Sequence, residues 1–180
     1  SAIGAADKLG FKPEQFEATA SLDVADEGKD KNACIVGRGP CIVHAEEWSG
    51  LGTDLGVTTQ RAFGICDDHG ALALTYDSDG MGVGLRGYAR ELNAARPARV
   101  PKVEVVAFHG SGAVVDPDGQ VPTATPDAEV LRPLAGVVRY PRLNGDYFLN
   151  YKAQSWWSLR LRFEKTHRAV TAGTLGAYQP

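Results

Sequence analysis

Two pairs of cysteine and histidine residues share one spacing. Two residues separate Cys41 from His44, and two separate Cys66 from His69. Thiolate and imidazole ligands in this number satisfy the tetrahedral coordination of zinc. The four residues therefore form a candidate metal site. The alternative reading places Cys41 on a buried apolar strand and His69 in an exposed turn.

The second pair resembles a motif of Rieske iron–sulfur domains. Gly70 follows His69, and these domains carry C-x2-H-G in the second of their two metal-binding loops. In their first loop, one residue separates the cysteine from the histidine and a glycine follows. Here Cys41 and His44 have two residues between them and Ala45 after them. The resemblance would imply an iron–sulfur cluster, but with this departure we predict that the chain carries no cofactor.

A glycine-rich segment between an apolar run and a candidate helix is a second place where chemistry is expected. Backbone amides at the start of a helix can bind phosphate. The segment is similar to the acetyl-coenzyme A loop of the GNAT superfamily, which would imply an acyl-coenzyme A-dependent N-acetyltransferase-like enzyme. The candidate binding residues are Gly80, Gly82, Gly84 and Gly87.

Two carboxylates count against a coenzyme A site in this segment. Asp77 occupies the position at which the GNAT family has a basic or amide residue, and Asp79 adds a second negative charge. Like charges beside a pyrophosphate weaken its binding. The enzyme reading is therefore kept as an alternative, beside the Cys/His metal-binding domain.

Other polar stretches give no catalytic residue. Ser111 lies close to His109, but G-x-S-x-G is absent and no base can be assigned to it. The acidic stretches 23–32 and 116–120 lack the glycine and terminal glutamate of a calcium-binding helix-loop-helix, so we interpret them as loop or turn. We assign no catalytic residue.

Composition indicates an ordinary globular chain. The 180 residues are 43% hydrophobic and 23% charged, with a formal net charge of −3, which predicts one domain over residues 1–180. Three cysteines are an odd number for a disulfide framework. Two groups of arginines, within residues 86–99 and 139–162, are interpreted as parts of solvent-exposed faces. We therefore expect no nucleic-acid partner.

Alternating apolar residues predict β hairpins along much of the chain. The runs 61–66 and 71–77 flank a turn, as do 103–108 and 113–115, and 136–164 read as a meander around the Asn144-Gly145 turn. Residues 15–24 suit another strand, and 25–60 read as loop with short elements. The predicted fold is mainly β, with α+β possible: an antiparallel, hairpin-rich sheet that forms a sandwich or rolls up, with one helix near 83–96.

The two ends predict an assembly role. Residues 1–15 and 168–180 are rich in small residues, which recover little of the entropy lost on ordering, so we expect extended arms that neighbouring subunits hold. We therefore predict a non-enzymatic structural subunit of a homo-oligomer, similar in form to capsid-associated or phage-tail proteins, whose partners are copies of itself or other subunits. The expected contact residues are Trp156, Trp157, Arg160 and Arg162.

The chain has no apolar segment long enough to span a membrane, and its start lacks the features of a signal peptide. We therefore expect a location in the cytoplasm or within an assembled particle, without evident secretion.

Overall fold

A computed structural model describes most of the chain. The described backbone forms two compact units, which divide between His109 and Gly110. The described residues are 13–25, 30–39, 41–51, 54–80, 84–123 and 142–173.

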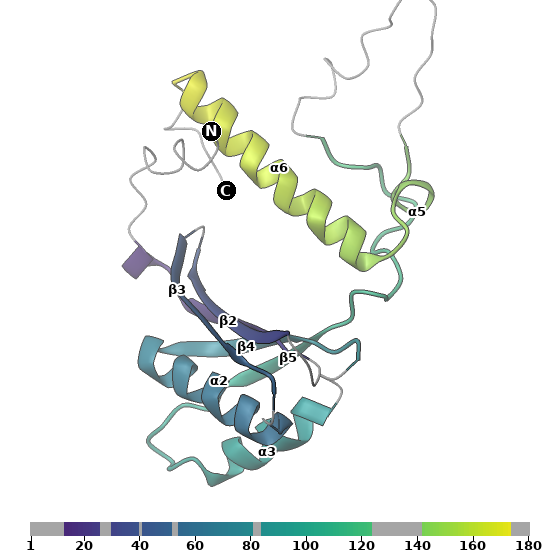
Figure 1. Ribbon diagram of the computed structural model, residues 1–180. Helices are drawn as coiled ribbons and strands as arrows, with labels where there is room; N and C mark the ends of the chain where they lie inside the picture. The colour runs from purple at the N-terminus through teal and green to yellow at the C-terminus, as the bar shows by residue number, and fades with distance from the viewer. Residues whose placement is uncertain are drawn as a thin grey trace, which may run out of the picture. The chain divides into compact units, whose positions relative to one another are not determined.

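Five strands form a mixed sheet in the unit that ends at His109 (Figure 1). Their order across the sheet is β3-β2-β1-β4-β5. The pairs β1–β2 and β2–β3 are antiparallel, whereas β1–β4 and β4–β5 are parallel. The strands are β1 (Ala18–Asp23), β2 (Lys31–Arg38), β3 (Cys41–Ser49), β4 (Ala71–Asp77) and β5 (Glu104–Phe108). A short 3-10 turn, Pro13–Gln15, precedes them.

Two helices lie on the same face of this sheet (Figure 1). Helix α2 (Leu55–His69) packs against β1, β2 and β4, and α3 (Leu85–Ala95) packs against α2. Asp54 caps the start of α2, because its side chain accepts a hydrogen bond from the Val57 amide. Gly70 ends α2 in the left-handed conformation, which glycine adopts without a steric penalty.

The core lies between the sheet and α2. Strand β1 alternates buried and exposed residues, as expected for a strand that is covered on one face. Leu22 and Leu74 belong to the core on the side of the sheet, and Phe63 belongs to it on the side of α2. The residues without exposed surface include Ala20, Cys34, Val36, Ala62, Cys66, Leu74 and Leu85.

The other unit contains a short helix and a long one, α5 (Asn144–Tyr147) and α6 (Tyr151–Thr171). The Asn150 side chain caps α6 by accepting a hydrogen bond from the Ala153 amide. A bridge between Gln120 and Leu143 joins two separate parts of the chain.

The α+β alternative is confirmed, and the mainly β, antiparallel description is wrong. Residues 61–66 belong to α2 rather than to a hairpin, and β4 pairs in parallel with β1 and β5. The predicted helix near 83–96 is confirmed as α3, and the runs 15–24, 71–77 and 103–108 contain β1, β4 and β5.

Two further predictions of local structure are also wrong. The Asn144-Gly145 turn is part of α5, and residues 151–164 lie in α6 rather than in a meander. The segment 25–60, predicted as loop with short elements, instead has most of its residues in β2, β3 and the start of α2.

Most of both predicted arms lies outside the described residues. Of the described part, residues 13–15 form the 3-10 turn and residues 168–171 belong to the last turn of α6. Among the residues that the structure describes, none of the helices is long and apolar enough to cross a membrane.

Candidate functional site

The carboxyl ends of the parallel strands carry two aspartates side by side. Asp23 is the last residue of β1, and Asp77 is the last residue of β4. Leu22 pairs with Tyr76, so Asp23 and Asp77 are the next residues along two neighbouring strands. Since neighbouring strands lie about 4.8 Å apart, the two backbones approach closely there.

Both aspartates point away from the helices. Leu22 and Tyr76 are 3% exposed and belong to the core that α2 covers. Successive side chains of a strand alternate between the faces of the sheet, so Asp23 and Asp77 project from the face opposite α2. Asp23 is exposed and Asp77 is half-buried, so solvent and ligands can reach both carboxylates.

The chain around Asp77 holds its carboxylate in place. The backbone amide of Asp79 donates a hydrogen bond to Asp77 Oδ1 at 2.9 Å. Asp79 in turn lies near His109, with 3.9 Å between its Oδ1 and His109 Nδ1. His109 directly follows β5, so three parallel strands contribute to this edge of the sheet, which we call the acidic edge: Asp23, Asp77, Ser78, Asp79 and His109.

The donor set of the acidic edge suits a hard divalent cation. Carboxylate oxygens are preferred by Mg²⁺, Mn²⁺ and Ca²⁺, and Mg²⁺ is commonly held by one or two carboxylates together with water and substrate phosphates. Asp23 and Asp77 meet this requirement. Within the described ranges there is no cluster of three or more His, Cys, Asp and Glu side chains arranged to hold a metal ion.

Among the residues that the structure describes, the predicted Cys/His set forms no group of three or more side chains that could hold a metal ion. The rings of His44 and His69 stack, with 4.3 Å between their centroids, and His44 Nε2 lies 3.4 Å from Glu46 Oε2. Cys66 is buried in the core, where burial raises the pKa of its thiol to about 12.

The glycine-rich segment is described in part. Gly80 has a positive φ of 92° and follows β4, whereas Gly82 lies outside the described residues. Gly84 is the N-cap residue of α3, and Gly87 lies inside that helix. The use of this segment for an acyl-coenzyme A stays a prediction.

The four predicted contact residues belong to α6. Trp156 is 65% exposed, and the Trp157 indole donates a hydrogen bond to the Pro122 carbonyl. The Arg160 guanidinium lies 4.7 Å from the Trp157 ring centroid and also binds Glu164. Their role in contacts between subunits stays a prediction.

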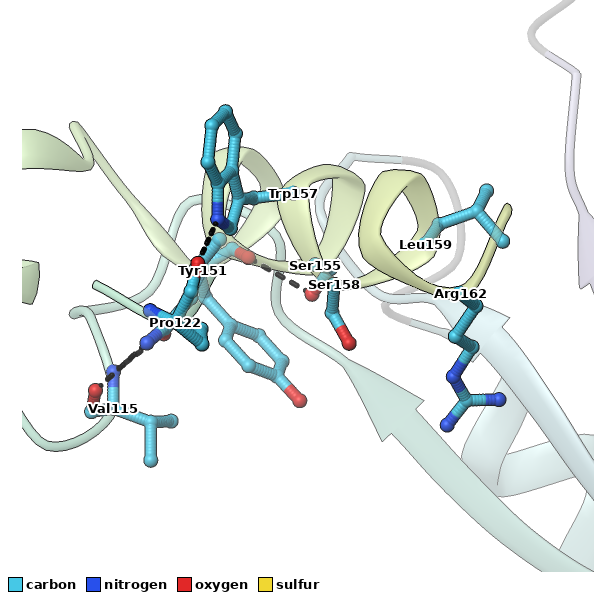
Figure 2. A pocket seen from close by; sticks show the side chains of 9 residues that line it. Val115, Pro122, Tyr151, Ser155, Trp157, Ser158, Leu159 and Arg162 are labelled. Atoms are coloured by element: carbon cyan, nitrogen blue, oxygen red, sulfur yellow. Dashed lines mark hydrogen bonds between the residues drawn. The ribbon is translucent and has the colours of Figure 1, made fainter. Parts of the chain in front are cut away.

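Beside α6 lies a cavity of about 550 Å³ (Figure 2). Trp157 and Arg162 line it, and Gln154 fixes one wall by pairing with both the amide and the carbonyl of Val115. Figure 2 shows Trp157 and Arg162 on α6 among the residues that line the cavity. Among the described residues that line the cavity, Arg162 alone is charged. The lining therefore does not indicate a particular ligand.

Comparison with solved structures relates the chain to a nuclease. It is similar to the nuclease domain of the large terminase subunit gp2 of bacterial virus Sf6, with 27% identity and a TM-score of 0.67. A lysine-to-alanine mutant of that domain with manganese and beta-thujaplicinol gives 27% identity and 0.68, and the mutant with calcium gives 27% and 0.67. Each match covers 98% of this chain and 64% of the other.

This chain therefore spans less than two thirds of the length of the nuclease domain that it resembles. No family model matches the sequence, and no curated protein matches it.

The similarity overturns the expectation of a non-enzymatic structural subunit, because the matching structures are an enzyme domain. It also overturns the expectation that nucleic acid is not a partner, since a nuclease acts on nucleic acid. That expectation rested on the lack of a concentrated basic surface.

Sequence reasoning missed the acidic edge. From the sequence, Asp23 is interpreted as part of a hydrophilic loop. Asp77 is interpreted as a negative charge that weakens the binding of a pyrophosphate. The available signal was an aspartate at the end of each of two apolar runs, "ATASLD" and "ALALTYD".

Proposed function

We propose that this chain is a metal-dependent nuclease domain that hydrolyses phosphodiester bonds of DNA. The observation that carries the proposal is the placement of Asp23 and Asp77 at adjacent ends of parallel strands, on the face that α2 leaves uncovered. The similarity to a terminase nuclease domain, seen with manganese and with calcium, supports it.

The roles of the residues follow from their chemistry. Asp23 and Asp77 would hold a divalent cation between β1 and β4. The cation, when bound, neutralises charge on the phosphate and lowers the pKa of water. Asp77 is kept in one orientation by the Asp79 amide, which removes the need to order it when substrate arrives.

The proposed site depends on the sheet for its precision. Leu22 and Tyr76 anchor the residues immediately before the two aspartates, and both side chains are buried. The parallel register then fixes the separation of the two backbones. A site built on packed strands is more exactly positioned than one built on loops.

The test is cleavage of supercoiled plasmid DNA by the 180-residue chain with Mn²⁺ or Mg²⁺. We expect the wild-type protein to convert the plasmid to nicked and linear forms, with no cleavage in EDTA. Asp23→Asn and Asp77→Asn should each lower the rate by at least about 100-fold, since a neutral amide is a weaker ligand for these cations.

The matched control is Asp68→Asn. Asp68 is also exposed, but it lies in the last turn of α2, next to the amino end of β4 and therefore at the other end of that strand from Asp77. The Asp68→Asn variant should cleave the plasmid at the wild-type rate. Metal-independent cleavage, or full activity of Asp77→Asn, would refute the proposal.

A further inference from the structure

His109 forms a short contact with a buried serine at the acidic edge. Its Nδ1 lies 2.7 Å from the Ser78 hydroxyl oxygen, and the same hydroxyl lies 3.0 Å from the Phe108 carbonyl oxygen. Ser78 is 6% exposed, and its amide also donates to the Phe108 carbonyl at 3.0 Å. The imidazole is therefore anchored to the packed ends of β4 and β5.

These contacts indicate which ring nitrogen carries the proton. The Ser78 hydroxyl has one proton, and the Phe108 carbonyl can only accept it. With that proton donated to Phe108, the hydroxyl oxygen accepts from His109 Nδ1–H. A hydrogen on Nδ1 would also face the Asp79 carboxylate, whose Oδ1 lies 3.9 Å from this nitrogen.

The other nitrogen, Nε2, is then an acceptor with a free lone pair. The His109 side chain is 67% exposed, so water can reach Nε2. An imidazole that is fixed through one nitrogen and open at the other is the usual arrangement of a histidine that acts on a ligand or a water.

We propose that His109 is a catalytic residue of the nuclease site, whose Nε2 accepts a hydrogen bond from the attacking water and orients it. The inference rests on the proposed function. Its position supports the role, because His109 lies near Asp79, whose amide binds the Asp77 carboxylate. Ser78 is then the positioning residue that holds the ring.

The reaction that His109 assists is hydrolysis. A bond forms between the water oxygen and phosphorus, and the bond between phosphorus and one ester oxygen breaks. The water loses one proton to the solvent, and the leaving oxygen takes one proton from the solvent. His109 contributes orientation, so its loss should lower kcat and leave KM for DNA nearly unchanged.

Two amide substitutions separate the nitrogens of the ring. In His109→Asn the amide takes the place of Nδ1 and keeps the bond to Ser78, but nothing replaces Nε2. In His109→Gln the longer side chain brings an amide oxygen to the place of Nε2. We expect kcat to fall roughly 100-fold in His109→Asn, and His109→Gln to recover part of this loss.

The matched control is the same pair of substitutions at His69. This histidine ends α2 beside the amino end of β4, which spans Ala71–Asp77 and is thus about 20 Å long. His69→Asn and His69→Gln should keep the wild-type kcat. If His109→Asn also keeps it, this inference is wrong while the nuclease proposal stands. If the wild-type chain cleaves no DNA with any divalent metal, both fail.

A second measurement does not depend on activity. Two-bond ¹H–¹⁵N correlation spectra of the imidazoles report which nitrogen is protonated. We expect His109 in the Nδ1–H form at neutral pH, and Ser78→Ala to shift it toward the Nε2–H form, with the backbone spectrum of the sheet unchanged. A wild-type His109 with its proton on Nε2 would overturn the inference.

Discussion

Asp23 and Asp77 end two neighbouring parallel strands, one position beyond the paired residues Leu22 and Tyr76. Like charges at facing positions of neighbouring strands repel each other, and a cation bound between them removes this repulsion. A divalent metal ion bound by both carboxylates would therefore relieve their mutual repulsion.

The first prediction concerns stability with metal. Mn²⁺ should raise the melting temperature of the wild-type chain, since a ligand at 100 times its Kd adds about 2.7 kcal/mol to the free energy of unfolding. In Asp77→Asn the shift should be small, and the metal-free melting temperature should not fall, because one of two like charges is gone. Differential scanning fluorimetry over a range of Mn²⁺ concentrations measures both. Equal shifts in the two proteins would show that the metal binds elsewhere.

The second prediction tests which face of β4 is buried. Leu74 is 0% exposed, so Leu74→Ala should lower the free energy of unfolding by about 2–5 kcal/mol. Leu72 belongs to the same strand but is 51% exposed, and Leu72→Ala should cost less than about 1 kcal/mol. Guanidinium chloride unfolding followed by circular dichroism measures the two values. Similar losses would contradict the one-sided burial of the sheet.

Continuous apolar runs were the best guide to strands. The run 71–77 is β4 with the same bounds: residues 71–74 are apolar, and Thr75 and Tyr76 are of types that strands favour. The hairpin reading failed where alternation also suited a helix. Leu159, Leu161 and Phe163 alternate as in a strand, yet on α6 Leu159 and Phe163 share one side and Leu161 lies on another. Leu161 alone of the three is buried.

The end of α2 shows a related ambiguity. Asp67 and Asp68 followed by Gly70 suit a hairpin turn, but Gly70 is instead the left-handed cap of a helix, with φ 65°. Residues of these types serve both purposes, and the buried side chains of α2 decide between them.

The acidic edge depends on parallel pairing, which local sequence does not encode. Fifty-four positions separate Asp23 from Asp77 in the chain. In an antiparallel pair of strands, residues that end each strand lie at opposite edges of the sheet. The hairpin interpretation therefore gave no reason to expect these two carboxylates together.

The third prediction concerns Glu46 on β3. Arg61 Nε donates a hydrogen bond to Glu46 Oε1 at 2.7 Å, and this bond is the main reason that the pKa of Glu46 is lowered. Arg61→Gln should raise that pKa. A lowered pKa contributes stability at pH values above that of the unfolded carboxyl, and this contribution is lost as the pH falls through the folded value. NMR titration of the Glu46 side-chain carbon measures the change.

The control for this prediction is the neighbouring ion pair between Lys31 and Glu47, which also joins β2 and β3. Lys31→Gln removes a positive charge of the same sheet but leaves the Arg61 bond intact. The pKa of Glu46 should then stay at its wild-type value. If Lys31→Gln raised the pKa of Glu46 as much as Arg61→Gln does, the positive charge of nearby side chains, and not the hydrogen bond, would be what lowers this pKa.

The fourth prediction uses the two buried thiols, Cys34 on β2 and Cys66 on α2. Burial raises the pKa of Cys34 to about 11 and that of Cys66 to about 12. The unfolded chain releases these protons near pH 9, whereas the folded chain keeps them. The free energy of unfolding should therefore fall as the pH rises from about 9 to 11, by at most about 1.4 kcal/mol per pH unit for each thiol.

Urea unfolding at pH 8.5 and pH 10.5 measures this loss. Lysines and tyrosines titrate in the same range, so the informative quantity is the difference between the wild type and the double variant Cys34→Ala/Cys66→Ala. The variant should be less stable at pH 8.5, because two buried side chains are shortened, but it should lose less stability on going to pH 10.5. If both proteins lose the same amount, the two thiols ionise in the folded state as readily as in the unfolded one, and their burial does not protect them.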